Sequence, residues 1–102
     1  MKQDHRELAP FLDGAGRLTA LPAKNRKKLL ALHYLAGRID AGRTYSEYEL
    51  GVLLDELTDF HDPATLRREL YNKRLLERTD DGARYWRAEV IPPLSDFIAR
   101  HI

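Results

Sequence analysis

Residues 62 to 87 constrain the fold of this chain more than any other stretch. Asp62 is a favoured helix N-cap, because its carboxylate can accept hydrogen bonds from the unpaired N–H groups of the first turn. Pro63 follows at the first helical position, where its missing N–H costs nothing. Leu66 and Leu70 lie four residues apart and therefore share one helical face. The pattern predicts a short helix that starts at Pro63 and buries both leucines.

The periodicity changes after this helix. Residues 75–79 and 84–87 have the composition of strands, and Asp80-Asp81-Gly82 lies between them. An Asp-Gly pair between two such runs is a strong signal for a β-hairpin, since glycine accepts a positive φ without steric cost. Tyr85 and Trp86 alternate across the second strand, so one should face the core and the other the surface. A helix followed by this hairpin is the second half of a winged helix.

Two more helices are predicted before it. Pro22 opens a largely apolar helix over residues 23–37, and residues 37–44 form a loop. Ser46 and Glu49 have the spacing of a capping box, and the helix they begin extends to about residue 57. Its leucines repeat at i, i+3, i+4 and i+7, and its outer face is acidic, which disfavours contact with DNA.

The ends of the chain add two segments. A short helix broken near Pro10 and an Asp-Gly-Ala-Gly turn at residues 13–16 are expected near the start. Leu94, Phe97 and Ile98 predict an amphipathic terminal helix that either packs on its own domain, which we favour, or contacts a second copy or a regulator partner. The predicted fold is mainly α with a small β-hairpin (α+β): a single winged helix-turn-helix domain over residues 1–102. It comprises an N-terminal extension (1–21), a core (22–88) and a terminal helix (92–102).

Composition limits the functional classes. The chain has 102 residues, no cysteine and a formal net charge of +1. Without cysteine it can form neither a disulfide framework nor a thiolate metal site. We expect a cytoplasmic protein without a membrane partner, since no apolar run has membrane-spanning length and the first five residues do not resemble a signal peptide. Affinity for phosphates would depend on an uneven distribution of charge.

Several short motifs together resemble one uncharacterised bacterial domain family. They are Gly16-Arg17-Leu18, Leu21-Pro22 with Lys24, Tyr45-Ser46-Glu47 with Glu49 and Leu54, His61-Asp62, residues 66–70, residues 75–78 and Tyr85-Trp86. The resemblance covers residues 11–87. It implies a winged-helix-like domain of unknown function that occurs alone or C-terminal to helix-turn-helix transcription regulators. Gly51 departs from the family pattern, which has asparagine there, so no role of that asparagine carries over.

The candidate nucleic-acid-binding residues are basic or amide side chains in three segments. In a winged-helix domain, the helix equivalent to residues 63–74 of this chain enters the major groove of DNA. Arginine can pair with guanine through two hydrogen bonds, and lysine or arginine neutralises phosphates. The alternative for Arg67 or Arg68 is an ion pair with Glu69, Glu49 or Asp62 that braces the fold. The candidates are Arg67, Arg68, Asn72, Lys73, Arg74, Lys24, Lys27, Lys28 and Arg84.

Two functions compete at this stage. The first is a small DNA-binding transcriptional regulator, in which the lysines near residue 24 share a surface with Arg68 and Arg74. The second is a protein-interaction module on the same scaffold, with an exposed apolar patch over the terminal helix or a docking surface on the acidic helix. The acidic hairpin tip at Asp80-Asp81 favours the second function.

Neither a catalytic motif nor a cofactor motif is present in the sequence, and the four histidines lack metal-ligand spacing. We therefore expect neither an enzyme nor a metal site.

Overall fold

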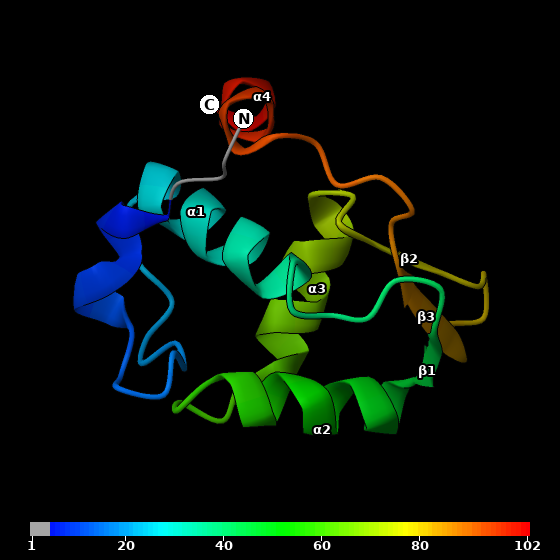
Figure 1. Cartoon of the computed structure of the whole chain (residues 1–102). Helices are drawn as coiled ribbons and strands as arrows, with labels where there is room; N and C mark the ends of the chain where they lie inside the picture. The colour runs from blue at the N-terminus through cyan, green and yellow to red at the C-terminus, as the bar shows by residue number, and fades with distance from the viewer. Residues whose placement is uncertain (1–4) are drawn as a thin grey trace.

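Helices and a small sheet alternate along residues 5–102, the part of the chain that the computed structural model describes. The helices are the 3-10 helix η1 (Arg6–Phe11), α1 (Asn25–Ala36), α2 (Glu47–Leu57), α3 (Pro63–Asn72) and α4 (Leu94–His101). Strands β1 (Thr44–Ser46), β2 (Leu76–Arg78) and β3 (Arg84–Arg87) form one antiparallel sheet in the order β1-β3-β2 (Figure 1). The mixed α+β architecture that the sequence predicts is confirmed.

The helix starts follow their sequence signals. Asp62 accepts a hydrogen bond from the N–H of Thr65 at 3.3 Å, and Pro63 begins α3. At the start of α2, Ser46 Oγ accepts from the N–H of Glu49 at 3.0 Å, and Glu49 Oε1 accepts from the N–H of Ser46 at 2.8 Å. The predicted capping box is therefore present. Helix α1 is shorter than the predicted range of 23–37, since it begins at Asn25 and ends at Ala36.

Strand β1 is the main correction to the sequence prediction, which gave a loop up to residue 44. It pairs with β3, so that Tyr45 lies opposite Tyr85, and both rings are buried. Three residues are too few to show an alternating pattern, and hydrogen bonds from a distant segment stabilise this strand. Strand β2 is also shorter than predicted, because Leu75 and Thr79 lie just outside it.

The hydrophobic core surrounds α1. Four of its leucines, at positions 29, 30, 32 and 35, are at most 1 % exposed. Such all-round burial requires neighbours on several sides, and α1 contacts η1, α3 and α4 (Figure 1). Phe97 of α4 is fully buried, and Leu94 and Ile98 are nearly so. Helix α4 thus packs on its own domain, as we favoured. The first four residues of the predicted N-terminal extension lie outside the described residues.

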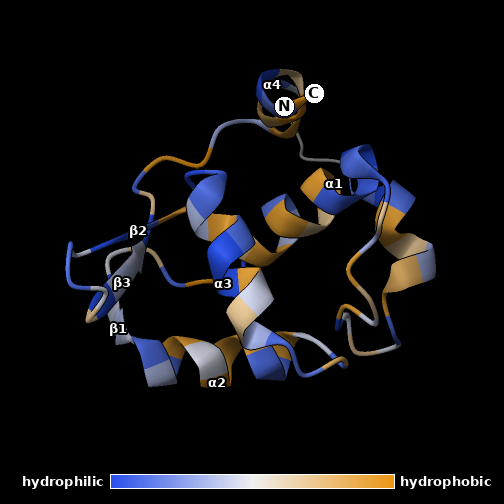
Figure 2. Ribbon diagram, turned by 180° about the vertical axis from the view of Figure 1, so that it is seen from behind, coloured by the Kyte–Doolittle hydropathy of each residue, from blue (hydrophilic) through white to orange (hydrophobic). Residues whose placement is uncertain are grey.

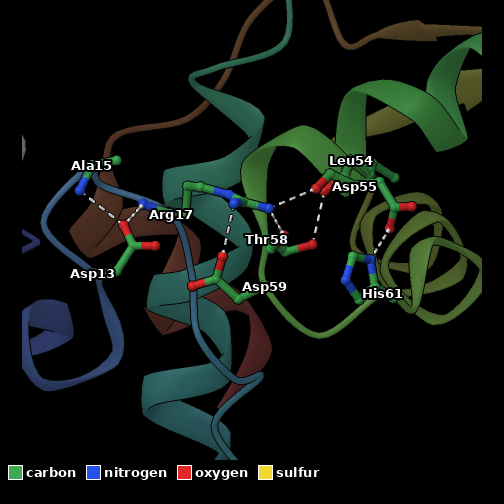
Figure 3. A network of polar contacts seen from close by, with 8 residues as sticks. All are labelled: Asp13, Ala15, Arg17, Leu54, Asp55, Thr58, Asp59 and His61. Atoms are coloured by element: carbon green, nitrogen blue, oxygen red, sulfur yellow. Dashed lines mark hydrogen bonds and ion pairs between the residues drawn. The ribbon is translucent and has the colours of Figure 1, made fainter.

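A polar network ties the N-terminal extension to the turn between α2 and α3 (Figure 3). The guanidinium of Arg17 forms an ion pair with Asp59 at 3.1 Å and donates to the backbone carbonyls of Asp55 and Thr58. Asp13 Oδ1 accepts from the N–H of Arg17 at 2.9 Å, within the predicted turn. The Asp13 carboxylate can accept a hydrogen bond from the carboxyl of Asp59, which raises the pKa of Asp59. This network therefore holds the end of α2 and the following turn against the N-terminal extension.

The capping box makes the stability of the fold depend on pH. The hydrogen bond from the N–H of Ser46 lowers the pKa of Glu49 in the folded chain, so the folded state binds fewer protons than the unfolded state in this range. The contribution of Glu49 to the free energy of unfolding is complete above its unfolded pKa of about 4.3 and is lost as pH falls through the folded pKa.

The Glu49→Gln variant keeps a hydrogen-bond acceptor that does not titrate. Its free energy of unfolding, measured with urea between about pH 5 and pH 3, should fall less steeply than that of the wild type. If the free energies of unfolding of the variant and the wild type fell equally with pH, Glu49 would not be the group responsible.

Candidate nucleic-acid interface

The rotation of α3 decides which of its side chains reach solvent. Leu66 and Leu70 are fully buried, so the opposite side of the helix faces outward. Arg68 and Asn72 lie four residues apart on this outward side, and both are exposed. Figure 2 shows hydrophilic stretches along α3, whereas α1 is hydrophilic at its start and mainly hydrophobic beyond it. No ion pair holds Arg68 within residues 5–102, so its guanidinium is available for an anionic partner.

Arg67, by contrast, is used inside the fold. Its guanidinium pairs with Glu47 of α2 at 2.8 Å and lies 5.8 Å from the centre of the Tyr85 ring. Only 21 % of the Arg67 side chain is exposed. The sequence left open that Arg67 or Arg68 pairs with Glu69, Glu49 or Asp62, and the observed partner is none of these three carboxylates. Arg67 therefore joins α3 to the start of α2 and to the sheet.

The other flank of α3 faces the start of α1. Lys28 pairs with Glu69 at 3.5 Å, which brings the first turns of α1 beside the second half of α3. Lys73 lies one turn beyond Glu69, and its charge helps to lower the pKa of His101 in α4, where burial is the larger cause. Among the described residues, no ion pair holds Lys24, Lys27 or Lys73. Arg26 instead pairs with Glu7 of η1 at 2.9 Å.

The end of α3 places one candidate in an unusual backbone conformation. The N–H of Leu75 donates a hydrogen bond to the carbonyl of Leu70 at 2.9 Å. The N–H of Arg74 donates to the carbonyl of Tyr71 at 3.0 Å. These two bonds form a Schellman motif, in which Leu70 and Leu75 supply the usual apolar contact and are both buried. The residue at the left-handed position of this motif is usually glycine, but here it is Arg74, with φ 63°. The charged residue Arg74 therefore occupies a backbone position that favours glycine.

The hairpin carries charges of both signs. Arg84 is exposed on β3, whereas the turn contains Asp80 and Asp81. Hydrogen bonds from the hydroxyl of Thr79 and the N–H of Ala83 lower the pKa of Asp81, which keeps the hairpin tip negative. Of the two aromatic residues of β3, Tyr85 is buried and the half-buried Trp86 donates its Nε1–H to Glu77 at 3.1 Å, as the alternation predicted. The tip is therefore negative, whereas β3 beside it carries the exposed cation Arg84.

The sequence of residues 17–87 matches the model of a bacterial family described as "Uncharacterized protein conserved in bacteria (DUF2087)". The chain belongs to this family. The resemblance to an uncharacterised bacterial family is thus confirmed, and the matched region extends from the Arg17 network to the end of β3. In this DUF2087 chain, η1 and α4 lie outside the matched region. Comparisons with curated proteins and with solved structures gave no match.

Three further features of the described part of this DUF2087 chain concern metal ions, membranes and protein contacts. Residues 5–102 contain no group of three or more His, Asp or Glu side chains that could hold a metal ion. None of the helices there is long and apolar enough to cross a membrane. The apolar patch that an interaction module would expose on the terminal helix is absent, because Leu94, Phe97 and Ile98 are buried. The large exposed apolar residues on the acidic helix α2 are Tyr48 (80 %) and Val52 (42 %).

Sequence reasoning missed one basic residue beside α3. Arg78 of β2 lies with its guanidinium carbon 4.4 Å from the centre of the Tyr71 ring. Hydrogen bonds to the hydroxyls of Tyr85 and Tyr71 raise its pKa, so its charge is secure. The sequence signal that could have pointed to Arg78 is the alternation along β2, which puts Leu76 and Arg78 on one side of the strand. This signal does not identify the residue that Arg78 contacts.

The different roles of the two neighbouring arginines can be tested through stability. Arg67→Ala should lower the free energy of unfolding by about 1 kcal/mol, because it removes an ion pair and the packing of the arginine stem. Arg68→Ala should leave the free energy of unfolding within about 0.5 kcal/mol of the wild type, since its side chain is exposed. Urea unfolding of both variants under identical conditions measures the difference. Equal losses would contradict the assigned roles.

The backbone at Arg74 generates a second prediction. Arg74→Gly relieves a left-handed conformation that costs a non-glycine residue about 1 kcal/mol, partly offset by the greater freedom of glycine in the unfolded chain. Its midpoint of thermal unfolding should therefore equal or exceed that of the wild type. Arg74→Ala removes the same charge but keeps the strain, and should not be stabilised. A clear loss of stability in both variants would show instead that the arginine side chain supports the fold.

Proposed function

We propose that this protein is a winged-helix DNA-binding protein that inserts α3 into the major groove. The winged-helix assignment is supported by the order of elements, α1-β1-α2-α3-β2-β3, and by the strand order β1-β3-β2. In that scaffold α2 and α3 form the helix-turn-helix, and the β2–β3 hairpin is the wing. Helix α3 then stands beside the wing with its outward side open to the duplex.

The observation that carries the proposal is the outward pair Arg68 and Asn72. Both are exposed, and Arg68 forms no ion pair within residues 5–102. A guanidinium can bond to two acceptors of guanine, and an amide can pair with the donor and acceptor of adenine. Lys73 and Arg74 directly follow the last residue of α3 and add positive charge for contact with phosphates. Arg67 and Lys28, which the sequence also put forward, act in this proposal by orienting α3.

Charge distribution indicates how the wing takes part. Asp80 and Asp81 keep its tip away from the phosphate backbone, whereas Arg84 lies on its return strand. We therefore assign the main contact to α3 and the strands beside it. With a net charge of only +1, electrostatic attraction over long distances is weak, and affinity depends on this local surface. A regulator of transcription in the bacterial cytoplasm is the cellular role we propose.

Fluorescence polarisation with a labelled generic DNA duplex tests the proposal. The wild type should bind at low salt, and log K should fall linearly with log salt concentration because counterions are released. Arg68→Ala should weaken binding about tenfold, within the range typical for losing one arginine contact. The matched control is Arg38→Ala, which removes an exposed cation that lies over the Tyr34 ring and lines a groove beside α2.

Two results would contradict the proposal. The first is no binding of the duplex at low salt, which would favour the exposed Tyr48 and Val52 of α2 as a protein contact. The second is an equal loss of affinity in Arg38→Ala and Arg68→Ala, since general charge rather than the outward side of α3 would then account for binding.

A further inference from the structure

A groove lies between the end of α3 and strand β2, next to the proposed duplex-binding surface. It has a volume of about 510 Å³, within the roughly 300–1,000 Å³ of typical ligand sites. Its lining combines one aromatic ring, two guanidinium groups, an amide and a carboxylate with a small apolar floor. These residues are Tyr71, Asn72, Arg74, Leu76, Glu77, Arg78 and Ala88.

The aromatic part of the groove is the Tyr71 ring, with the guanidinium of Arg78 over one face. The guanidinium carbon of Arg78 lies 4.4 Å from the centre of the Tyr71 ring, and 39 % of Tyr71 remains exposed. Unpaired bases stack on aromatic rings and on the planes of arginine guanidinium groups. A base could therefore extend this stack. Paired bases inside a duplex have no free face to offer, so the chemistry favours an unpaired nucleotide.

The polar groups distinguish a base from a phosphate. Glu77 points to the other side of β2, where it accepts the Nε1–H of Trp86, so its carboxylate takes no part in the stack. Asn72 supplies the amide that pairs with adenine. Arg74, also on the lining, is available for the phosphate of the same nucleotide.

We propose that this groove holds one unpaired nucleotide at the end of a DNA strand, with its base stacked on Tyr71 and Arg78. The phosphate lies on Arg74, and the amino group of adenine meets Asn72, so that in this complex Asn72 contacts the unpaired base and Arg68 the duplex. The inference rests on the proposed function, since it needs a strand held along α3. A free nucleotide has the same chemistry, and the experiment separates the two sources.

The experiment compares three probes by fluorescence polarisation. They are a blunt duplex, the same duplex with three unpaired adenines at one end, and the same duplex with three unpaired thymines. The wild type should bind the adenine overhang about tenfold more tightly than the blunt duplex, which corresponds to one stacked base, and the thymine overhang less tightly than the adenine overhang. Tyr71→Ala should abolish the gain from the overhang, and Tyr71→Phe, which keeps the ring, should retain it.

A matched control comes from the other exposed tyrosine. Tyr48 of α2 is more exposed than Tyr71, and Tyr48→Ala should leave binding of every probe unchanged. Circular dichroism checks that both alanine variants are folded, and Asn72→Ala gives a second test, since it should reduce the preference for adenine over thymine.

The outcomes separate the two proposals. Equal binding of blunt and overhanging duplexes by the wild type would overturn the nucleotide groove and leave the proposed function standing. Binding of none of the probes would overturn both. Displacement of the adenine overhang by micromolar dAMP would identify a free nucleotide as the ligand and overturn the strand-end assignment.

Discussion

The burial of Leu66 and Leu70 is the constraint on which the rest of the structure depends. Because both are fully buried, they fix the rotation of α3, and every other side chain of the helix takes its place from them. The Schellman motif continues this anchoring, since Leu75 packs beyond the helix end and starts the path into β2. A different rotation would expose a leucine and bury a guanidinium, which costs several kcal/mol.

Adjacent charges on α3 have different roles as a consequence. Arg67 and Glu69 lie on the flanks and pair with α2 and α1, so they hold the helix against its neighbours. Arg68 and Asn72 lie on the outward side. In the proposed function the first group orients the helix and the second contacts DNA. The left-handed Arg74 fits this division, because a backbone position that favours glycine keeps a cation beside the groove.

The elements with local signals could be predicted from the sequence. Asp62 with Pro63, Ser46 with Glu49, and Asp81-Gly82 each specify a helix start or turn through hydrogen bonds within a few residues, and all three formed as expected. Features that depend on distant partners could not be predicted. Strand β1 exists through pairing with β3, and the partner of Arg67 is Glu47, twenty positions away in the sequence. The groove beside Tyr71 likewise requires the end of α3 and β2 to be seen together.

The most direct test of the account is a titration of the isotopically labelled protein with duplex DNA at low salt, followed by amide chemical-shift changes in NMR spectra. The account predicts that the largest changes lie at Arg68, Asn72 and Arg74, with small changes along α2. Changes centred on Tyr48 and Val52, or the absence of any change, would contradict the claim that the outward side of α3 is the binding surface.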